Sequence, residues 1–157
     1  MGRTWSEGGL DAQDERRIAV ELFNETWALL ERPDRGAEED LRMLHAAHAS
    51  RFHWGEIGEP VNLARGEWQC SRVYAVLGRA EPARFHAERC LELCEANGIG
   101  DLDLAYAYEA LARAERLVGD EEAVRGHLDD ARAAATRIAE AEDREHFLRD
   151  LADLEPR

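Results

Sequence analysis

Apolar side chains recur every three or four residues along seven stretches of the chain, with charged residues between them. This spacing places the apolar positions on one face of an α-helix. Glycine marks most of the breaks between stretches, often with Pro or Asp at the next start, which is typical of helix ends. The pattern therefore predicts an all-α fold of seven helices joined by short loops. The predicted helices cover residues 11–32, 37–54, 60–77, 81–96, 101–118, 121–140 and 142–154.

The chain also resembles itself at a shift of 41 residues. Three helix pairs and one extra helix account for its length. We expect the pairs to be antiparallel and stacked side by side, because a single amphipathic pair cannot bury its apolar stripe alone. The aligned columns include Leu22, Leu63 and Leu104; His45, His86 and His127; and Trp27 with Trp68.

Three histidines and a tryptophan crowd residues 45–54. His45 recurs once in each repeat, so we interpret it as a packing position rather than a metal ligand. Around a helix, the directions of His48 and His53 diverge by about 140°, which prevents them from closing on one ion by themselves. A surface metal site formed by His48, His53 and Glu56 is the weaker alternative.

Small and aromatic residues recur at fixed places within the repeats. In the third repeat, Tyr108 and Leu111 precede a Gly119-Asp120 turn. This arrangement resembles the tetratricopeptide repeat over roughly residues 15–141, although the period is 41 residues rather than 34. The resemblance implies an α-α superhelix. The last predicted helix has Phe147, Leu148, Leu151 and Leu154 on one face, so we expect it to cover the open end of the third pair. The other residues that carry the resemblance are Ala112, Ala123, Leu128 and Ala131, and in the middle repeat Cys70, Ser71, Tyr74, Gly78, Ala83, Ala87 and Cys90.

In tetratricopeptide arrays the first helix of each pair lines a concave groove, so the resemblance implies a groove that binds a peptide or a partner protein segment. Arg65, Trp68 and Arg72 would lie at its centre. Trp27 and Trp68 could instead fill the core. The Lys and Asn pattern of the family's carboxylate clamp is not reproduced. The expected groove residues are Asn24, Arg65, Trp68, Gln69, Arg72, Tyr106, Glu109 and Arg113.

Charge narrows the range of partners. The chain has 34 acidic and 20 basic residues, all of the latter arginine, for a net charge of −14. This balance argues against nucleic acids and anionic membranes, which need a basic surface. No secretory signal or long apolar run is visible, so we expect a cytoplasmic protein. Cys70, Cys90 and Cys94 fall inside helical patterns, and we expect them to be reduced and buried.

Sequence motifs do not indicate catalysis. No phosphate-binding glycine loop, nucleophile elbow or zinc-protease motif is present, so we assign no catalytic residue, cofactor or metal ligand. The first hypothesis is a non-catalytic interaction module. The alternative is a small-molecule or metal-binding protein, with enzyme activity left open. Its site would be built from His53, Trp54, Arg65, Trp68, Arg72 and His86.

For organisation, we expect a flexible N-terminal arm at residues 1–10 and a single helical-repeat domain at residues 11–157. The first helix has more apolar surface than one stripe requires, which favours a homodimer through that helix. The competing hypothesis is that residues 1–10, with Trp5, fold back over it. The apolar residues concerned are Ile18, Ala19, Val20, Leu22, Phe23, Trp27, Leu29 and Leu30.

Overall fold

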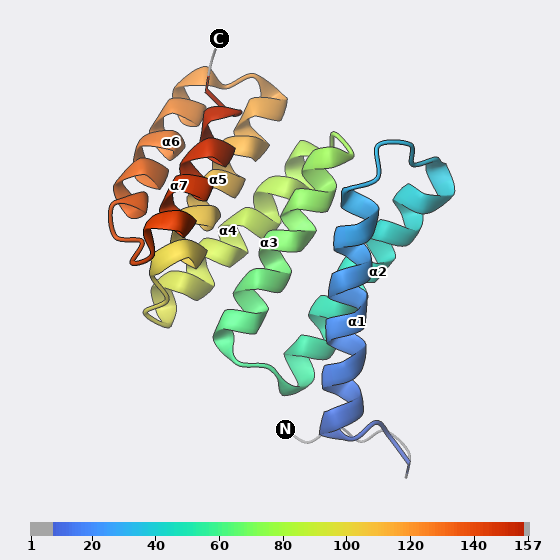
Figure 1. Ribbon diagram of the computed structural model, residues 1–157. Coiled ribbons are helices and arrows are strands. Elements are labelled where there is room, and N and C mark those ends of the chain that lie inside the picture. The colour runs from blue at the N-terminus through green and yellow to red at the C-terminus, as the bar shows by residue number, and fades with distance from the viewer. Residues whose placement is uncertain (1–7, 156–157) are drawn as a thin grey trace.

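The computed structural model describes residues 8–155, and in this range the chain forms seven α-helices and no strand. The all-α prediction is therefore confirmed. Figure 1 shows the helices following one another across the molecule, with α7 lying against the last pair. The bounds are α1 (Ala12–Leu30), α2 (Ala37–Ile57), α3 (Pro60–Val76), α4 (Ala80–Ala96), α5 (Asp101–Val118), α6 (Glu121–Ala135) and α7 (Ala141–Ala152).

The helices pack as three adjacent antiparallel pairs. The most extensive contacts join α1 to α2, α3 to α4 and α5 to α6. Neighbouring pairs meet through α2–α3 and α4–α5, and the first helices α1, α3 and α5 also touch in series. The predicted 41-residue offset separates the starts of α3 and α5, and also those of α4 and α6. The first pair departs from this offset because both of its helices are longer than those of the second pair.

Local sequence explains where the helices begin and end. Asp11 and Asp120 accept backbone N–H bonds at the starts of α1 and α6, at 2.8 and 3.0 Å. Pro60 opens α3, where its missing N–H costs nothing. Gly119 ends α5 with a φ of 76°, a left-handed conformation that glycine adopts without strain. Gly119 and Asp120 belong to the glycine and aspartate signals that predict the helix ends from the sequence.

Two predicted boundaries are wrong. Helix α2 continues through Gly55 to Ile57, because Trp54 is buried and its packing offsets the roughly 1 kcal/mol cost of a helical glycine. Helix α6 stops at Ala135 instead of residue 140. The chain turns there so that Ile138, only 2% exposed, enters the core.

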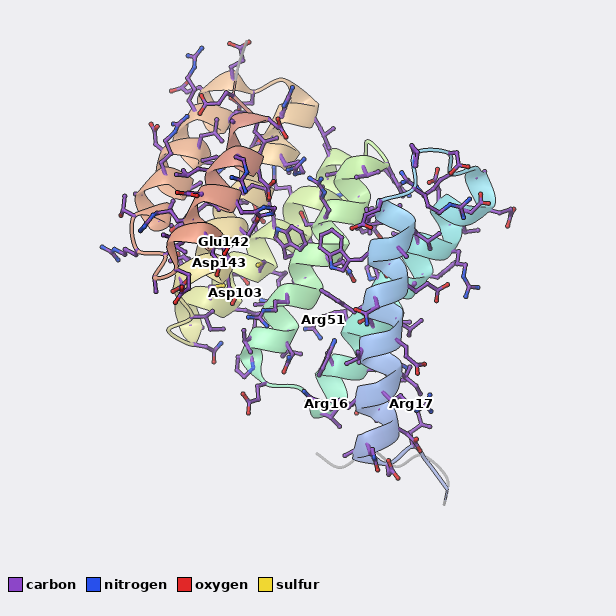
Figure 2. All side chains as sticks on the ribbon, in the orientation of Figure 1. Arg16, Arg17, Arg51, Asp103, Glu142 and Asp143 are labelled. Atoms are coloured by element: carbon purple, nitrogen blue, oxygen red, sulfur yellow. The ribbon has the colours of Figure 1, made fainter. Side chains whose placement is uncertain are left out.

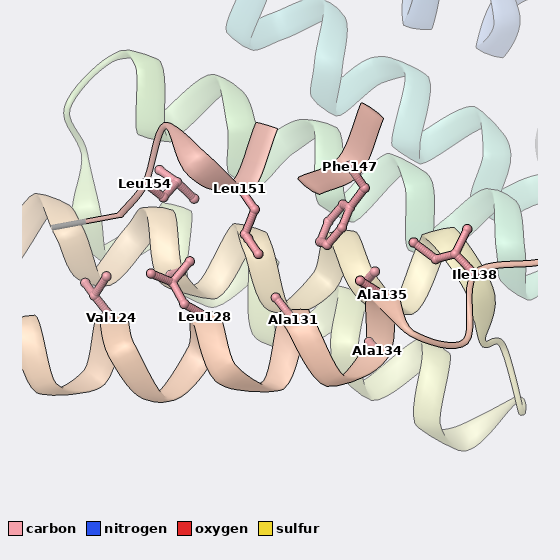
Figure 3. Packing of buried hydrophobic residues seen from close by; sticks show 11 residues of the cluster. Val124, Leu128, Ala131, Ala134, Ala135, Ile138, Phe147, Leu151 and Leu154 are labelled. Carbon is pink, nitrogen blue, oxygen red and sulfur yellow. The ribbon is translucent and has the colours of Figure 1, made fainter. Parts of the chain in front are cut away.

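Helix α7 covers the open end of the third pair. Phe147, Leu151 and Leu154 are buried against α6 and α5, and Figure 3 shows them facing the apolar side of α6. The expected covering role is confirmed for these three residues. Leu148 was expected on the same face but is 42% exposed, because it points away from the cluster. The α6 residues beneath are Val124, Leu128, Ala131, Ala134 and Ala135.

At the other end, most of the apolar surface of α1 is used within the chain. Val20 is exposed, whereas the other apolar residues named for this helix are buried or half-buried. The expected homodimer stays a prediction. Trp5 and most of the expected arm lie outside the described residues. Within residues 8–155, none of the helices combines the length and the apolar character that a membrane-spanning segment requires.

Candidate functional site

A cavity of about 580 Å³ lies on the side of the molecule formed by the first helices. We call it the first-helix cavity. Its walls come from α1, α3 and α5, with further residues from α4 and from α7 and its C-cap. The lining residues are Phe23, Trp27, Ala64, Arg65, Trp68, Arg72, Cys90, Leu102, Asp103, Tyr106, Glu109, Arg113, His146, Asp150 and Asp153.

Aromatic rings form one wall of the cavity. The ring centroids of Trp27 and Trp68 are 5.4 Å apart, and those of Trp68 and Tyr106 are 5.6 Å apart. Tyr106 in turn meets Phe147 edge-on at 4.9 Å. Both tryptophans are half-buried, and Trp68 also packs on core residues of α4 and α5. Trp68 therefore contributes both to the cavity wall and to the packing of the core.

Most charged groups of the cavity are paired with each other. Arg65 donates two hydrogen bonds to Asp103, at 2.9 and 3.0 Å, and these bonds raise the pKa of its guanidinium. Asp103 lies on the side of α5 that faces α3 (Figure 2). Tyr106 donates to Asp150 of α7 at 2.6 Å. Burial, together with this hydrogen bond, raises the pKa of Tyr106, so the phenol stays protonated.

Arg72 is the exception. Its side chain is half-buried, and it makes no hydrogen bond or ion pair with any residue from 8 to 155. Burial, and then the positive charge of Arg113, lower its pKa, although a guanidinium remains charged throughout the physiological range. The negative charges of Glu109 and Asp150 offset part of this effect, but neither carboxylate makes a hydrogen bond or ion pair with Arg72. A partly desolvated cation without a direct acceptor is costly, and an anionic group in the cavity would relieve that cost.

Two buried polar atoms on residues that line the same cavity also lack partners among the described residues. Glu109 is 1% exposed, and its Oε1 atom accepts from Arg113 Nε at 2.8 Å, whereas its Oε2 atom accepts nothing. The indole Nε1 of Trp68 is likewise buried without an acceptor. Unpaired buried polar atoms are rare in folded proteins and call for an explanation.

Comparison with known proteins finds no match. No protein-family model, no curated protein and no solved structure is significantly similar to the chain. The function must therefore be argued from the cavity itself and from the packing of the helix pairs around it.

Six of the eight predicted groove residues line the first-helix cavity, and two do not. Gln69 is fully buried, and its amide donates to the Phe23 carbonyl at 3.0 Å, so it joins α3 to α1 inside the core. Asn24 is exposed on α1 and lies outside the lining. Both are corrections. The six residues that line the cavity are Arg65, Trp68, Arg72, Tyr106, Glu109 and Arg113.

Sequence reasoning missed the contribution of α7. His146, Asp150 and Asp153 line the cavity, yet this helix was predicted only as a cover. A signal was available. A helix that follows the third pair and covers its end occupies the position that the first helix of a fourth pair would take. Since we expect first helices to line the groove, we would expect this helix to line it as well.

The alternative site is not assembled. His53 pairs with Glu15 of α1, and His86 pairs with Glu67, so both face away from the first-helix cavity. Trp54 is buried beneath the Arg16 guanidinium, 5.2 Å from its ring centroid. A second, smaller cavity of about 130 Å³ joins Trp54 to Arg65 beside Val20, Phe23 and Asn62.

His48 belongs to a network between the helix pairs. His48 Nε2 lies 2.8 Å from the Tyr74 hydroxyl, and the rings of Tyr74 and His86 are stacked. His45 is exposed, so its expected packing role is wrong. The alignment placed it correctly on a second helix but not on the buried face. Among the residues that the structure describes, no group of three His, Cys, Asp or Glu side chains is placed to hold a metal ion.

The cysteines behave as expected. Cys70, Cys90 and Cys94 are unlinked and at most 2% exposed. Burial, reinforced by the nearby Glu67 carboxylate, raises the pKa of Cys70 to about 12. Cys90 lines the first-helix cavity, but its hydrogen bond with Cys94 and its burial raise the pKa of its thiol as well. Thiols in this state are poor nucleophiles.

Proposed function

We propose that this protein is a non-catalytic, tetratricopeptide-like binding module that holds a carboxylate-bearing ligand in its first-helix cavity. The carboxylate belongs either to a side chain of a partner protein segment or to a free organic acid. The observation that carries the proposal is Arg72, a half-buried cation beside an aromatic wall that makes no hydrogen bond or ion pair with residues 8–155.

The packing of the helices supports the architectural part. In a tetratricopeptide array the first helices touch in series and line the concave face. Here α1, α3 and α5 touch in this order, α7 follows against α5, and all four contribute to one cavity. Repeat proteins use such surfaces for recognition.

The state of the polar groups supports binding rather than catalysis. Asp103 is held by Arg65, Glu109 by Arg113, and Asp150 by the Tyr106 hydroxyl. A general base has to be within reach of a substrate proton and not committed to a strong cation. The thiol of Cys90 is protonated at neutral pH, as its raised pKa requires.

The size of the cavity supports a compact ligand. Its volume of about 580 Å³ falls within the roughly 300–1,000 Å³ typical of small-molecule sites. Residues of α7 and its C-cap contribute to the lining beside those of α1, α3 and α5. A ligand with an aromatic or apolar body would bury that body against Trp27, Trp68 and Tyr106.

The test compares Arg72→Gln with wild type. The probes are phenylacetate, indole-3-acetate and short peptides with an internal Phe-Glu sequence, titrated by calorimetry. We expect at least one probe to bind wild type. We expect its affinity for Arg72→Gln to be lower by about tenfold or more, because a charge-assisted hydrogen bond is lost. Arg125→Gln, on the exposed surface of α6, is the matched control and should bind normally.

If the organic acids bind and the peptides do not, the ligand is a free organic acid. If the peptides bind and the organic acids do not, the ligand is a segment of a partner protein. Equal affinities of Arg72→Gln and Arg125→Gln for every probe would contradict the proposal. Circular dichroism of both variants would show whether each has kept its fold.

A further inference from the structure

We infer that the ligand is a free, zwitterionic α-amino acid with an aromatic or large apolar side chain. This inference deepens the proposed function and rests on it. The proposed function requires only a carboxylate at Arg72. The further inference adds a positively charged hydrogen-bond donor on the same ligand, which would bind the carboxylate of Glu109.

Glu109 offers an acceptor that the protein does not use. Its side chain is 1% exposed and its Oε2 atom has no hydrogen-bond partner in residues 8–155. Arg113 holds only the other oxygen, Oε1. A buried carboxylate oxygen without a donor is destabilising, and an ammonium group is the strongest donor that a small ligand can bring to it.

Arg72 offers the complementary donors close by. Arg72, Glu109, Arg113 and Asp150 all line the same cavity, and the charges of the other three act on Arg72. An α-amino acid has its ammonium and its carboxylate on the same carbon. It therefore delivers a donor to Glu109 and an acceptor to Arg72 together, which neither a simple acid nor a simple amine does.

The charge balance favours a neutral ligand. The lining contains three arginines against four carboxylates, those of Asp103, Glu109, Asp150 and Asp153, so the cavity has no excess of positive charge. The whole chain has a net charge of −14, which repels anions at long range. A zwitterion satisfies Arg72 without that repulsion.

The aromatic wall determines the side-chain preference. Trp27, Trp68 and Tyr106 lie in contact and present ring surface to the same cavity that contains Arg72 and Glu109. A phenyl, indolyl or isobutyl group would bury apolar area there, at roughly 25 cal/mol per Å². Glycine and alanine would lack this contact and bind weakly.

The experiment is a calorimetric titration of the full-length chain with a matched ligand series. The series is L-phenylalanine, L-tryptophan, L-leucine, glycine, N-acetyl-L-phenylalanine and L-phenylalaninamide. We expect the three large amino acids to bind. The derivatives with a blocked amine or a blocked carboxylate should bind about tenfold more weakly than phenylalanine, or worse, because each block leaves one buried charge of the protein unpaired.

Glu109→Gln identifies the residue responsible. The neutral amide in this variant should weaken the binding of phenylalanine. It should also remove most of the preference for phenylalanine over N-acetyl-L-phenylalanine. The control is Glu88→Gln, an exposed carboxylate on α4 that should leave all affinities unchanged. Should Glu109→Gln fail to fold, the ligand series on wild type decides the matter alone.

The two proposals fail in different ways. If N-acetyl-L-phenylalanine or phenylacetate binds as tightly as phenylalanine, or if no free amino acid binds, the inference is wrong and a carboxylate ligand at Arg72 still stands. If Arg72→Gln binds every ligand as wild type does, both are wrong.

Discussion

His86 and Glu67 form a hydrogen-bonded pair between α4 and α3, with 2.6 Å between Nδ1 and Oε2. Arg51 of α2 donates to the other oxygen of the same carboxylate, at 2.9 Å. Figure 2 shows Arg51 extending from α2 toward α3. Gly66 makes room for it, because a Cβ atom there would lie 2.8 Å from the Arg51 Cδ atom. One carboxylate thereby joins the first helix pair to the second.

Replacing this carboxylate should loosen the junction between the pairs. We expect Glu67→Gln to lower the free energy of unfolding by about 2 kcal/mol, because two charged hydrogen bonds to a buried group are lost. Urea denaturation followed by circular dichroism measures the change. Glu88→Gln, on the exposed face of α4, should stay within about 0.5 kcal/mol of wild type. Similar values for the two variants would show that the junction contributes little.

The same network should make the protein less stable in acid. Burial, followed by the charge of His86, lowers the pKa of His48 below 6.5. Burial alone would raise the pKa of Glu67, but the hydrogen bond from His86 and the charge of Arg51 outweigh it and lower the pKa below 4.5. In both cases the unfolded chain binds protons more readily than the folded one, so stability is full above the unfolded pKa and falls as the pH drops below it.

We therefore expect the melting temperature to decline from about pH 6.5 downward and more steeply below about pH 4.5. His48→Gln should reduce the fall in melting temperature that begins near the histidine pKa and should leave the steeper fall at lower pH unchanged. His45→Gln, at an exposed position on the same helix, should reproduce the wild-type profile. A first decline that persists in His48→Gln would assign it to another group.

Packing of α7 depends on one ring. Phe147 is fully buried, whereas its neighbour Leu148 is 42% exposed. Phe147→Ala should cost about 3–5 kcal/mol of stability, because it leaves a large cavity between α6 and α7. Leu148→Ala should cost less than about 1 kcal/mol. Thermal unfolding of the two variants side by side is the measurement, and equal losses would mean that α7 does not pack as described.

The cysteines should react slowly in the native protein. Cys70 is fully buried and its thiol has a pKa of about 12, so little thiolate exists at neutral pH. Ellman's reagent should modify fewer than one of the three thiols within minutes, and all three rapidly after denaturation. Rapid native labelling of Cys70 would show an accessible, activated thiol instead.

The homodimer expected through α1 is also testable. Val20 is exposed on this helix, so it would lie in such an interface. Light scattering at micromolar concentration should give twice the chain mass of 17.7 kDa, and Val20→Glu should return it to a monomer. A monomeric wild type would exclude the dimer under these conditions.

The fold was predictable from sequence because its determinants are local. Helix periodicity, glycine ends and caps such as Asp120 are each encoded within a few residues. The errors occurred where tertiary packing overrides local preference. Trp54 holds α2 in helical form past Gly55, and burial of Ile138 breaks α6 early.

The site was predictable only in part. Helical spacing places Trp68 and Gln69 about 100° apart on α3, an angle small enough for both to be assigned to the groove. The structure separates them, with Trp68 in the cavity wall and Gln69 in the core. Sequence alone cannot show that Arg65 pairs with Asp103 while Arg72 has no hydrogen-bond or ion-pair partner in the part of the chain that the structure describes. That difference depends on where α5 lies relative to α3.

Helix α7 has two surfaces in use at once. Phe147 and Leu151 pack in the hydrophobic core. Asp150 lines the cavity and accepts a hydrogen bond from the Tyr106 hydroxyl. The full lining of the first-helix cavity exists only while this helix is docked, so under the proposed function ligand binding and the docking of α7 would be thermodynamically linked. A bound ligand would reduce the rate at which the backbone amides of α7 exchange with solvent. If the proposed function holds, α7 would be a natural position for a reporter of ligand binding.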